Sequence, residues 1–278
     1  MDSKYGGDVA DVKLNSVNGM NKVNDNSNCD NIKYIIEKGI LCILHNVNRL
    51  DNENYESDVK FDVTNGSEIN LLLQKYFLGQ YYKNRHRFPV NLKTSRLLHT
   101  YIRWIESNQK RTFQIAYLYL FGYSSFIEIS DPLILICNCI RYLKNPSSTK
   151  FFDFEILQKY HSISDIITSI RKNVSKIERD NPNIHSELKE FVRMMEMFNY
   201  LFDKRLRNSI AHSDYLVKKD WKVLVHSKGK IYPYSVSDIK RLYDMAYLYL
   251  EGFIQSINDF SGKLLPGVDI SFSWGENY

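Results

Sequence analysis

Apolar residues return every three or four positions along most of the chain from residue 31 onward. This spacing places them on one face of a helix, and it is clearest at residues 31–50. The fold class that the pattern predicts is all-α, a multi-helix bundle. Further helices are expected to begin at Ser67 and to cover roughly residues 92–106, 111–123, 131–143, 154–160, 164–179, 186–202, 204–215 and 237–259.

Local signals set some of the boundaries and predict one short β-hairpin. Asp131–Pro132 offers an N-cap residue followed by proline at the first helical position, and Ser237 is expected to cap the last helix. Residues 221–225 and 230–234 are strand-like and flank a turn that contains glycine. We therefore expect a hairpin after the helix at residues 204–215.

Polar composition and a chain break divide the sequence into four segments. Residues 1–29 are rich in Asn, Asp, Ser and Gly, so they bury too little apolar surface to offset the entropy of ordering and are expected to form a disordered arm. Asn145–Ser148 interrupts the helical pattern. It separates a helical subdomain of unknown role, residues 30–145, from a helical domain, residues 150–262, and a C-terminal tail, residues 263–278. One continuous domain is the alternative.

Charge and composition narrow the class of protein only slightly. The net charge of +5 and the pI near 8.8 favour polyanionic partners. No N-terminal stretch has the pattern of a signal peptide, and no uninterrupted apolar segment reaches the ~20 residues of a membrane span. We therefore expect a soluble, cytoplasmic protein with no membrane partner.

The spacing of cysteine and histidine speaks against a metal site. The 4 cysteines lack paired CxxC spacing and are expected to be reduced structural thiols. Four histidines lack partners at metal-ligand spacing and are expected to be structural or surface residues: His45, His99, His161 and His226. We therefore expect no metal and no cofactor.

The segment Arg207–Tyr215, with the sequence RNSIAHSDY, is the one place where the sequence supports a reaction. An arginine can hold a phosphate with a planar fork of donors, and a histidine can carry a proton near neutral pH. On one continuous helix Asn208, His212 and Tyr215 would share a face, whereas Arg207 and His212 would diverge by about 140°. This divergence favours a cleft to which a second copy of the chain contributes the same residues.

RNA cleavage is the chemistry that suits these residue types. Without metal it needs a base for the 2′-hydroxyl, an acid for the leaving 5′-oxygen and positive charge at the phosphate. Arg207, Asn208 and His212 are the candidate catalytic residues. Two copies of His212 across a homodimer would transfer the protons, Arg207 would stabilise the phosphate charge, and Asn208 would orient the reacting groups.

The string Arg207-Asn208-x-x-x-His212, set between a long amphipathic helix and a C-terminal helix, resembles the signature of the HEPN superfamily (higher eukaryotes and prokaryotes nucleotide-binding). Its RNase branch carries an Arg-x(4 to 6)-His motif, often with a polar residue directly after the arginine. The resemblance covers about residues 150–262. An acidic residue from an upstream helix, found in some members, has no candidate in the sequence.

The resemblance implies a metal-independent, usually dimeric endoribonuclease with a composite site at the dimer cleft. Its products would end in a 2′,3′-cyclic phosphate and a 5′-hydroxyl. It further implies a bacterial toxin or abortive-infection effector in antiviral defence against phage, with an antitoxin or a phage-derived trigger as a second kind of partner.

The sequence leaves other interpretations open. The Arg-to-His spacing recurs at Arg205–His212 and Arg179–His185, so a surface or partly buried pair without chemistry would also account for it. A second hypothesis is a non-catalytic helical module that binds RNA, a nucleotide or a protein. A third is a metal-dependent phosphohydrolase or nucleotidyl transferase, which clustered carboxylates or a glycine-rich phosphate loop would support, and the sequence offers neither. Ser213–Tyr215 fits a helix-ending hydrogen-bond cluster better than catalysis.

Basic and aromatic residues suggest how RNA would bind. The candidate contacts are Lys204, Arg205, Tyr215, Lys218 and Lys219, which would follow the RNA backbone, although a solvated charged face fits the same charges. The basic triplet Arg85–Arg87 is expected to be a solvent-facing helix end. Base stacking is conceivable with 20 Tyr and 15 Phe, yet five aromatics within apolar helical runs are expected to be mostly buried: Tyr117, Tyr119, Phe121, Tyr247 and Tyr249.

Overall fold

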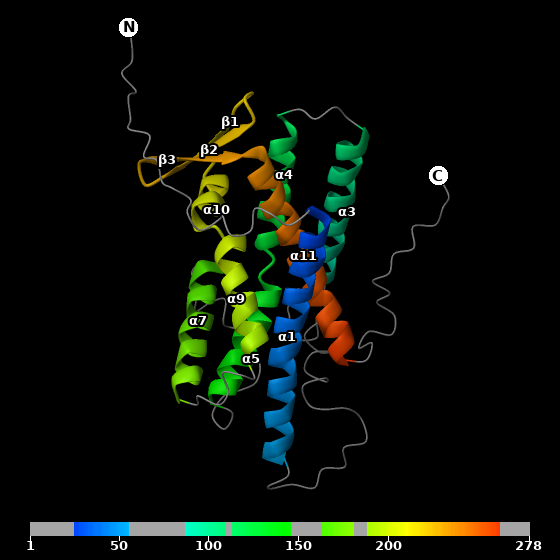
Figure 1. The fold of residues 1–278 in the computed structure, drawn as a ribbon, viewed down its shortest axis with the longest axis vertical. Coiled ribbons are helices and arrows are strands. Elements are labelled where there is room, and N and C mark those ends of the chain that lie inside the picture. Colours follow the sequence, from blue (N-terminus) through cyan, green and yellow to red (C-terminus); the bar gives the residue numbers. More distant parts are fainter. Residues whose placement is uncertain (1–24, 56–86, 109–112, 146–162, 181–187, 262–278) are drawn as a thin grey trace, which may run out of the picture.

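The computed structural model describes residues 25–55, 87–108, 113–145, 163–180 and 188–261. These residues form a mostly helical bundle with a small antiparallel sheet at one end (Figure 1). The prediction of a mainly helical protein is confirmed at this level. The helices predicted at Ser67 and at residues 154–160 lie outside the described residues, as do His161 and most of the expected N-terminal arm and C-terminal tail.

The helices agree with the apolar periodicity, with ends that differ from prediction by a few residues. Residues 25–29, expected in the arm, belong to the first helix instead. The helices are α1 (Asp25–Tyr55), α3 (Arg87–Asn108), α4 (Ile115–Ile127), α5 (Asp131–Lys144), α7 (Ile163–Asp180), α9 (Lys189–Leu201), α10 (Lys204–Ala211) and α11 (Val236–Ser261). The strands are β1 (Tyr215–Val217), β2 (Lys222–Ser227) and β3 (Lys230–Ser235).

The predicted hairpin is present, and a third strand extends it. Strands β2 and β3 pair antiparallel and are joined by Lys228 and Gly229, whose φ angles of 50° and 72° form a two-residue left-handed turn. Strand β1 pairs antiparallel with the other edge of β2, with Val217 opposite Val223. Three residues are too few for an alternating pattern to be recognised, which is why the sequence did not predict β1.

One hydrophobic core joins the helices. Helix α1 packs against α11, α9 and α5, while α11 also packs against α4, and α5 packs against α7. Some of these contacts require glycine: a Cβ on Gly122 of α4 would lie 2.6 Å from the ring of Tyr243 on α11, and one on Gly39 of α1 would lie 2.6 Å from Cβ of Met194 on α9. Described helices from both sides of the Asn145–Ser148 break therefore share this core.

Burial of the aromatic residues differs from the sequence expectation at two positions. Tyr119 and Tyr249 are buried, and Tyr247 is half-buried, as expected. Tyr117 and Phe121 are instead 43% and 60% exposed, so the expectation of burial is wrong for them. Both lie on the side of α4 that faces away from the core. The sequence did not show which side is exposed, because the residues of α4 are hydrophobic all round the helix.

Two helix starts are capped one or two residues earlier than predicted. The N-cap residue of α5 is Ser130, so Asp131 is already helical. At α11 the Ser235 hydroxyl accepts a hydrogen bond from the Asp238 amide (3.0 Å), and the Asp238 carboxylate accepts one from the Ser235 amide (2.9 Å). This reciprocal pair is a capping box, so Ser235 caps the helix in place of Ser237. The helix starts directly where β3 ends.

The stretch Ile115–Lys144 is long and apolar enough to cross a membrane by length and composition, with a mean hydropathy of 1.4. Because Glu128 and Asp131 lie within the stretch, it is not an uninterrupted apolar segment of the kind that the sequence was expected to lack. In the structure α4 and α5 divide the stretch, and 72% of the apolar window is buried inside the molecule. Core helices of soluble proteins meet the same criterion, so localisation stays a prediction.

Candidate functional site

Helix α10, which carries the motif, is fixed at its start by Asp203. The Asp203 carboxylate accepts hydrogen bonds from the amides of Arg205 (2.9 Å) and Leu206 (3.4 Å), as an N-cap residue does. It also accepts one from the Tyr234 hydroxyl of β3 (2.7 Å). Burial alone would raise the pKa of Asp203, but the hydrogen bonds from Tyr234 and Arg205 outweigh it and hold that pKa below its usual value. The carboxylate therefore joins α10 to the sheet.

The end of α10 is a sharp turn that begins at His212. The helix ends at Ala211, His212 is its C-cap residue, and Ser213 follows with a φ of 57°. The Asp214 amide then donates to the Ser209 carbonyl (2.8 Å), and the Ser213 amide donates to the Ile210 carbonyl (3.2 Å). This is a Schellman-type helix end with serine at the left-handed position. The prediction that the helix continues to Tyr215 is therefore wrong.

Ser209 holds this turn against the sheet. It is buried, and its hydroxyl is shared between the carbonyl oxygens of Asp214 (2.6 Å) and His226 (2.9 Å). The His226 amide in turn donates to the Asp214 carbonyl (2.8 Å). His226, expected to be a structural or surface residue, is exposed on β2 with its backbone attached to the turn that follows His212.

Arg207 points toward the end of α4. Its Nε and one terminal nitrogen donate to the two carboxylate oxygens of Glu128 at 2.5 Å and 3.3 Å. The Arg207 side chain is only 17% exposed, whereas that of Glu128 is 46% exposed. Glu128 is the C-cap residue of α4 and lies 79 positions away in the sequence. It is thus an acidic residue from an upstream helix beside the motif arginine, which the sequence left without a candidate.

Asn208 and His212 lie on the solvent side of α10. Both are exposed, and the His212 amide donates to the Asn208 carbonyl (3.0 Å), so they follow each other along one side of the helix. Tyr215 does not share this side, because it begins β1. Its ring lies 6.3 Å from that of Tyr117 on α4. The structure thus groups Asn208 with His212 and directs Arg207 to α4.

The remaining candidate RNA contacts fall into two groups. Lys204, Lys218 and Lys219 are exposed. Arg205 makes contacts within the protein: its guanidinium forms an ion pair with Asp203 (3.3 Å) and lies 4.8 Å from the centre of the Tyr232 ring. Three lysines are therefore open to solvent around α10 and β1, while Arg205 has a structural role at the N-cap.

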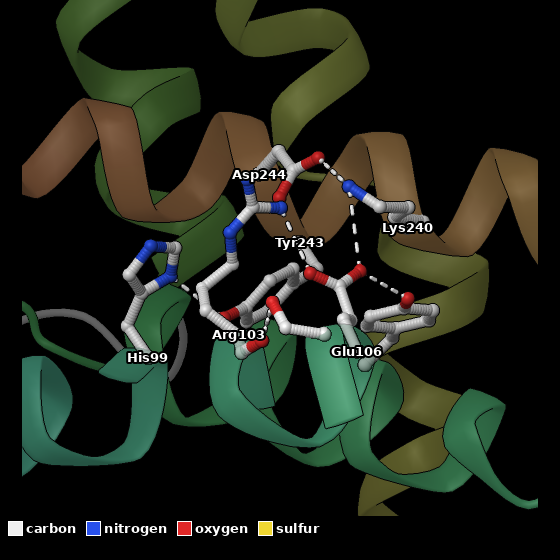
Figure 2. Close-up of polar contacts among 8 residues, drawn as sticks. His99, Arg103, Glu106, Lys240, Tyr243 and Asp244 are labelled. Atoms are coloured by element: carbon white, nitrogen blue, oxygen red, sulfur yellow. Dashed lines mark hydrogen bonds and ion pairs between the residues drawn. The ribbon is translucent and has the colours of Figure 1, made fainter. Parts of the chain in front are cut away.

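A second polar cluster, away from the motif, joins α3, α4 and α11 (Figure 2). Lys240 of α11 lies between the carboxylates of Asp244 (2.6 Å) and Glu106 (3.6 Å), and Arg103 pairs with Glu106 (2.8 Å). The Tyr119 hydroxyl also donates to Glu106. Two cations and two carboxylates balance one another, so the cluster holds the three helices together.

His99 completes this cluster on the side of α3. Its ring stacks on Tyr247 with a centroid distance of 3.6 Å, and its Nδ1 is 2.7 Å from the Tyr243 hydroxyl. Burial and the nearby charge of Arg103 lower the pKa of His99 to about 4. The ring is therefore neutral at physiological pH and is hydrogen bonded to the Tyr243 hydroxyl. A half-buried histidine on an amphipathic helix gives no sequence signal for these contacts.

Among the described residues no group of three or more His, Cys, Asp or Glu is placed to hold a metal ion. No protein-family model, curated protein or solved structure matches the chain. The resemblance to the HEPN superfamily therefore rests on the motif and on its setting at the end of α10.

Proposed function

We propose that the protein is a metal-independent endoribonuclease and that its site is built around the end of α10. The observation that carries the proposal is the arrangement of the three motif residues. Asn208 and His212 are exposed side by side, and the guanidinium of Arg207 is held at the edge of the same short helix by Glu128. This arrangement supplies a proton carrier and an amide on the solvent side of α10, with a positive charge on the neighbouring side that faces α4.

Each group has a defined part in the proposed reaction. The 2′-hydroxyl attacks the adjacent phosphorus and loses its proton to an imidazole, while the leaving 5′-oxygen gains a proton. A 2′,3′-cyclic phosphate and a 5′-hydroxyl result. His212 transfers protons, Arg207 stabilises the charge that builds up on the phosphate, and Asn208 orients the phosphate through its amide.

A second imidazole is needed for the other proton transfer. His212 of a second copy would supply it in a homodimer, as a two-fold cleft requires. Within one chain His226 would supply it, since its backbone is hydrogen bonded to Ser209 and Asp214 on either side of His212. The two sources are distinguished by a His226→Gln variant, which retains full cleavage if the dimer provides both groups.

Cleavage of a labelled RNA by the purified protein tests the proposal. We expect His212→Ala and Arg207→Ala each to lower the rate at least about a hundredfold, since one acid–base group or one group that stabilises transition-state charge typically contributes that much. His45→Ala, at an exposed histidine of α1, is the matched control and should cleave normally. Cleavage should also persist in excess chelator. Equal rates for wild type and both motif variants, with unchanged thermal unfolding, would rule out this site.

A non-catalytic RNA- or protein-binding module is the second candidate, and the Arg207–Glu128 pair favours it. The charge of Arg207 is already compensated, and little of its side chain is exposed. In that case the wild type binds its partner without cutting RNA. Induced expression separates the two functions, because an active RNase slows growth and its His212→Ala variant does not. Such toxicity would also support the proposed role as a bacterial toxin or antiphage effector.

A further inference from the structure

We propose that the outer face of α4, made of Tyr117, Phe121, Ser124 and Glu128, binds the unpaired bases of a single-stranded RNA. The inference rests on the proposed endoribonuclease function and adds the substrate class: RNA whose bases are free to stack. The sequence predicted that Tyr117 and Phe121 are buried, so the inference comes from their observed exposure.

The four residues form a continuous strip along the helix. Counted at 100° per residue, they fall within about 60° of one another around the α4 axis. Phe121 is 60% exposed and Tyr117 is 43% exposed. The two rings lie about one helical turn apart on the same face, so both can meet one extended ligand.

Two contacts place this strip beside the motif. At one end Glu128 pairs with Arg207, and at the other the Tyr117 ring lies 6.3 Å from that of Tyr215. Eleven residues separate these contacts on α4, a length of about 16 Å. The segment from Arg207 to Tyr215 therefore runs antiparallel to α4, and His212 lies between the two contacts in the sequence. The strip thus lies beside the segment that carries the proposed cleavage site.

Single-stranded RNA fits this surface better than a protein partner does. Exposed rings accept any base by stacking, whereas the bases of a duplex are already stacked and closed. Exposed lysines lie one turn before Arg207, at Lys204, and directly after β1, at Lys218 and Lys219. Exposed rings and nearby lysines match the two parts of a nucleotide, the base and the phosphate.

RNA binding by the full-length His212→Ala protein tests the inference without cleavage. The probe is a short fluorescent single-stranded RNA of mixed sequence, and the same sequence as a duplex is the comparison. We expect Phe121→Leu and Tyr117→Leu each to weaken single-strand binding at least about fivefold, the range found for loss of one stacked base. Duplex binding should not change. Trp104→Leu is the matched control, since Trp104 is 55% exposed but lies on α3.

Three results would overturn the inference. They are no binding of the single strand, equal binding by all variants, and an equal loss in the Trp104→Leu control. Light scattering adds a fourth: a fall in mass from dimer to monomer in Phe121→Leu, with unchanged RNA affinity, would make the strip a protein interface. Cleavage assays keep the two proposals apart, because RNA cutting that needs His212 but not Phe121 would defeat only the stacking surface. Weakened binding without any cutting by the wild type would defeat only the RNase.

Discussion

Ser209 shows how a single buried hydroxyl can set the position of a candidate catalytic histidine. Its oxygen is shared between two carbonyls, one on the turn after His212 and one on β2. The turn also contains Ser213 at a φ of 57°, a conformation in which a side chain is strained. The turn at His212 is thus stabilised by the hydrogen bonds of Ser209 and strained by the backbone conformation of Ser213.

This contrast predicts opposite effects of two variants in the same turn. Ser209→Ala should lower the free energy of unfolding by about 1–2 kcal/mol, because the carbonyls of Asp214 and His226 lose the buried Ser209 hydroxyl as a donor. Ser213→Gly should raise it by about 0.5–1 kcal/mol, because glycine adopts a positive φ without strain. Denaturant unfolding measures both. If His212 depends on this turn, RNA cleavage should fall in Ser209→Ala with its KM unchanged and stay normal in Ser213→Gly. A stabilising Ser209→Ala would contradict the hydrogen-bond assignment.

The residues of the site differ in how far the sequence could predict them. The string from Arg207 to His212 is contiguous, so it could be recognised directly. Glu128 meets the motif only through the packing of α4 on α10. No feature of the surrounding sequence distinguishes it from the other residues among the 32 Asp and Glu. His226 is likewise brought to the motif by the pairing of β1 with β2. Tertiary contacts of this kind leave no spacing rule in the chain.

At the scale of elements, two buried tyrosines lie at contacts between helices. Tyr123 of α4 donates its hydroxyl to the Leu201 carbonyl at the end of α9 (2.8 Å). Tyr249 of α11 packs edge-on against Phe198 and Phe202, and its buried hydroxyl has no hydrogen-bond partner within the described part of the chain. Both rings are fully buried. The two positions therefore differ mainly in whether the tyrosine hydroxyl has a hydrogen-bond partner.

Removal of that hydroxyl should have opposite signs at the two positions. We expect Tyr123→Phe to lower the free energy of unfolding by about 1 kcal/mol, because the Leu201 carbonyl loses its donor. Tyr249→Phe should be neutral or stabilising by up to about 1 kcal/mol, because it removes a buried polar group that is not satisfied. Chemical denaturation of both variants at one pH gives the comparison. A larger loss in Tyr249→Phe than in Tyr123→Phe would show that its hydroxyl has a partner.

Helices could be predicted from the sequence where one face alone meets the core. In α7, for example, the buried residues recur every three or four positions, from Ile163 to Ile177. Prediction failed where the chain reverses over a few residues: α10 ends at Ala211, and β1 follows after a three-residue turn. Such a turn depends on hydrogen bonds to β2. Prediction of burial from the sequence also failed for α4, because periodicity cannot distinguish an apolar outer face from an apolar inner face.

At the scale of the whole molecule, the cluster around His99 links the stability of the bundle to pH. His99 keeps a pKa of about 4 in the folded protein but has its ordinary value, about 6.5, in the unfolded chain. The unfolded chain therefore binds a proton between these two pH values that the folded protein does not. The contribution of His99 to stability is therefore complete above about pH 6.5 and is lost as the pH falls toward 4.

His99→Gln should remove this part of the pH dependence. Between pH 7 and pH 4 the wild type should lose on the order of 3 kcal/mol more stability than the variant, because the glutamine amide can still form a hydrogen bond with Tyr243 but does not titrate. Glu106 and Asp244 are present in both proteins, so the difference isolates the imidazole. Denaturant unfolding at several pH values measures it, with His45→Gln as the control at an exposed histidine. Parallel curves for wild type and His99→Gln would contradict the prediction.

The anchoring of α10 has a consequence for the order in which the protein assembles. A helix of eight residues is too short to be stable alone. Its contacts come from Glu128 before it in the chain and from His226 and Tyr234 after it. During synthesis the motif therefore leaves the ribosome before the strands that hold it. The nascent chain cannot form the site until β3 has emerged, so an RNase of this design would stay inactive through that part of its own synthesis.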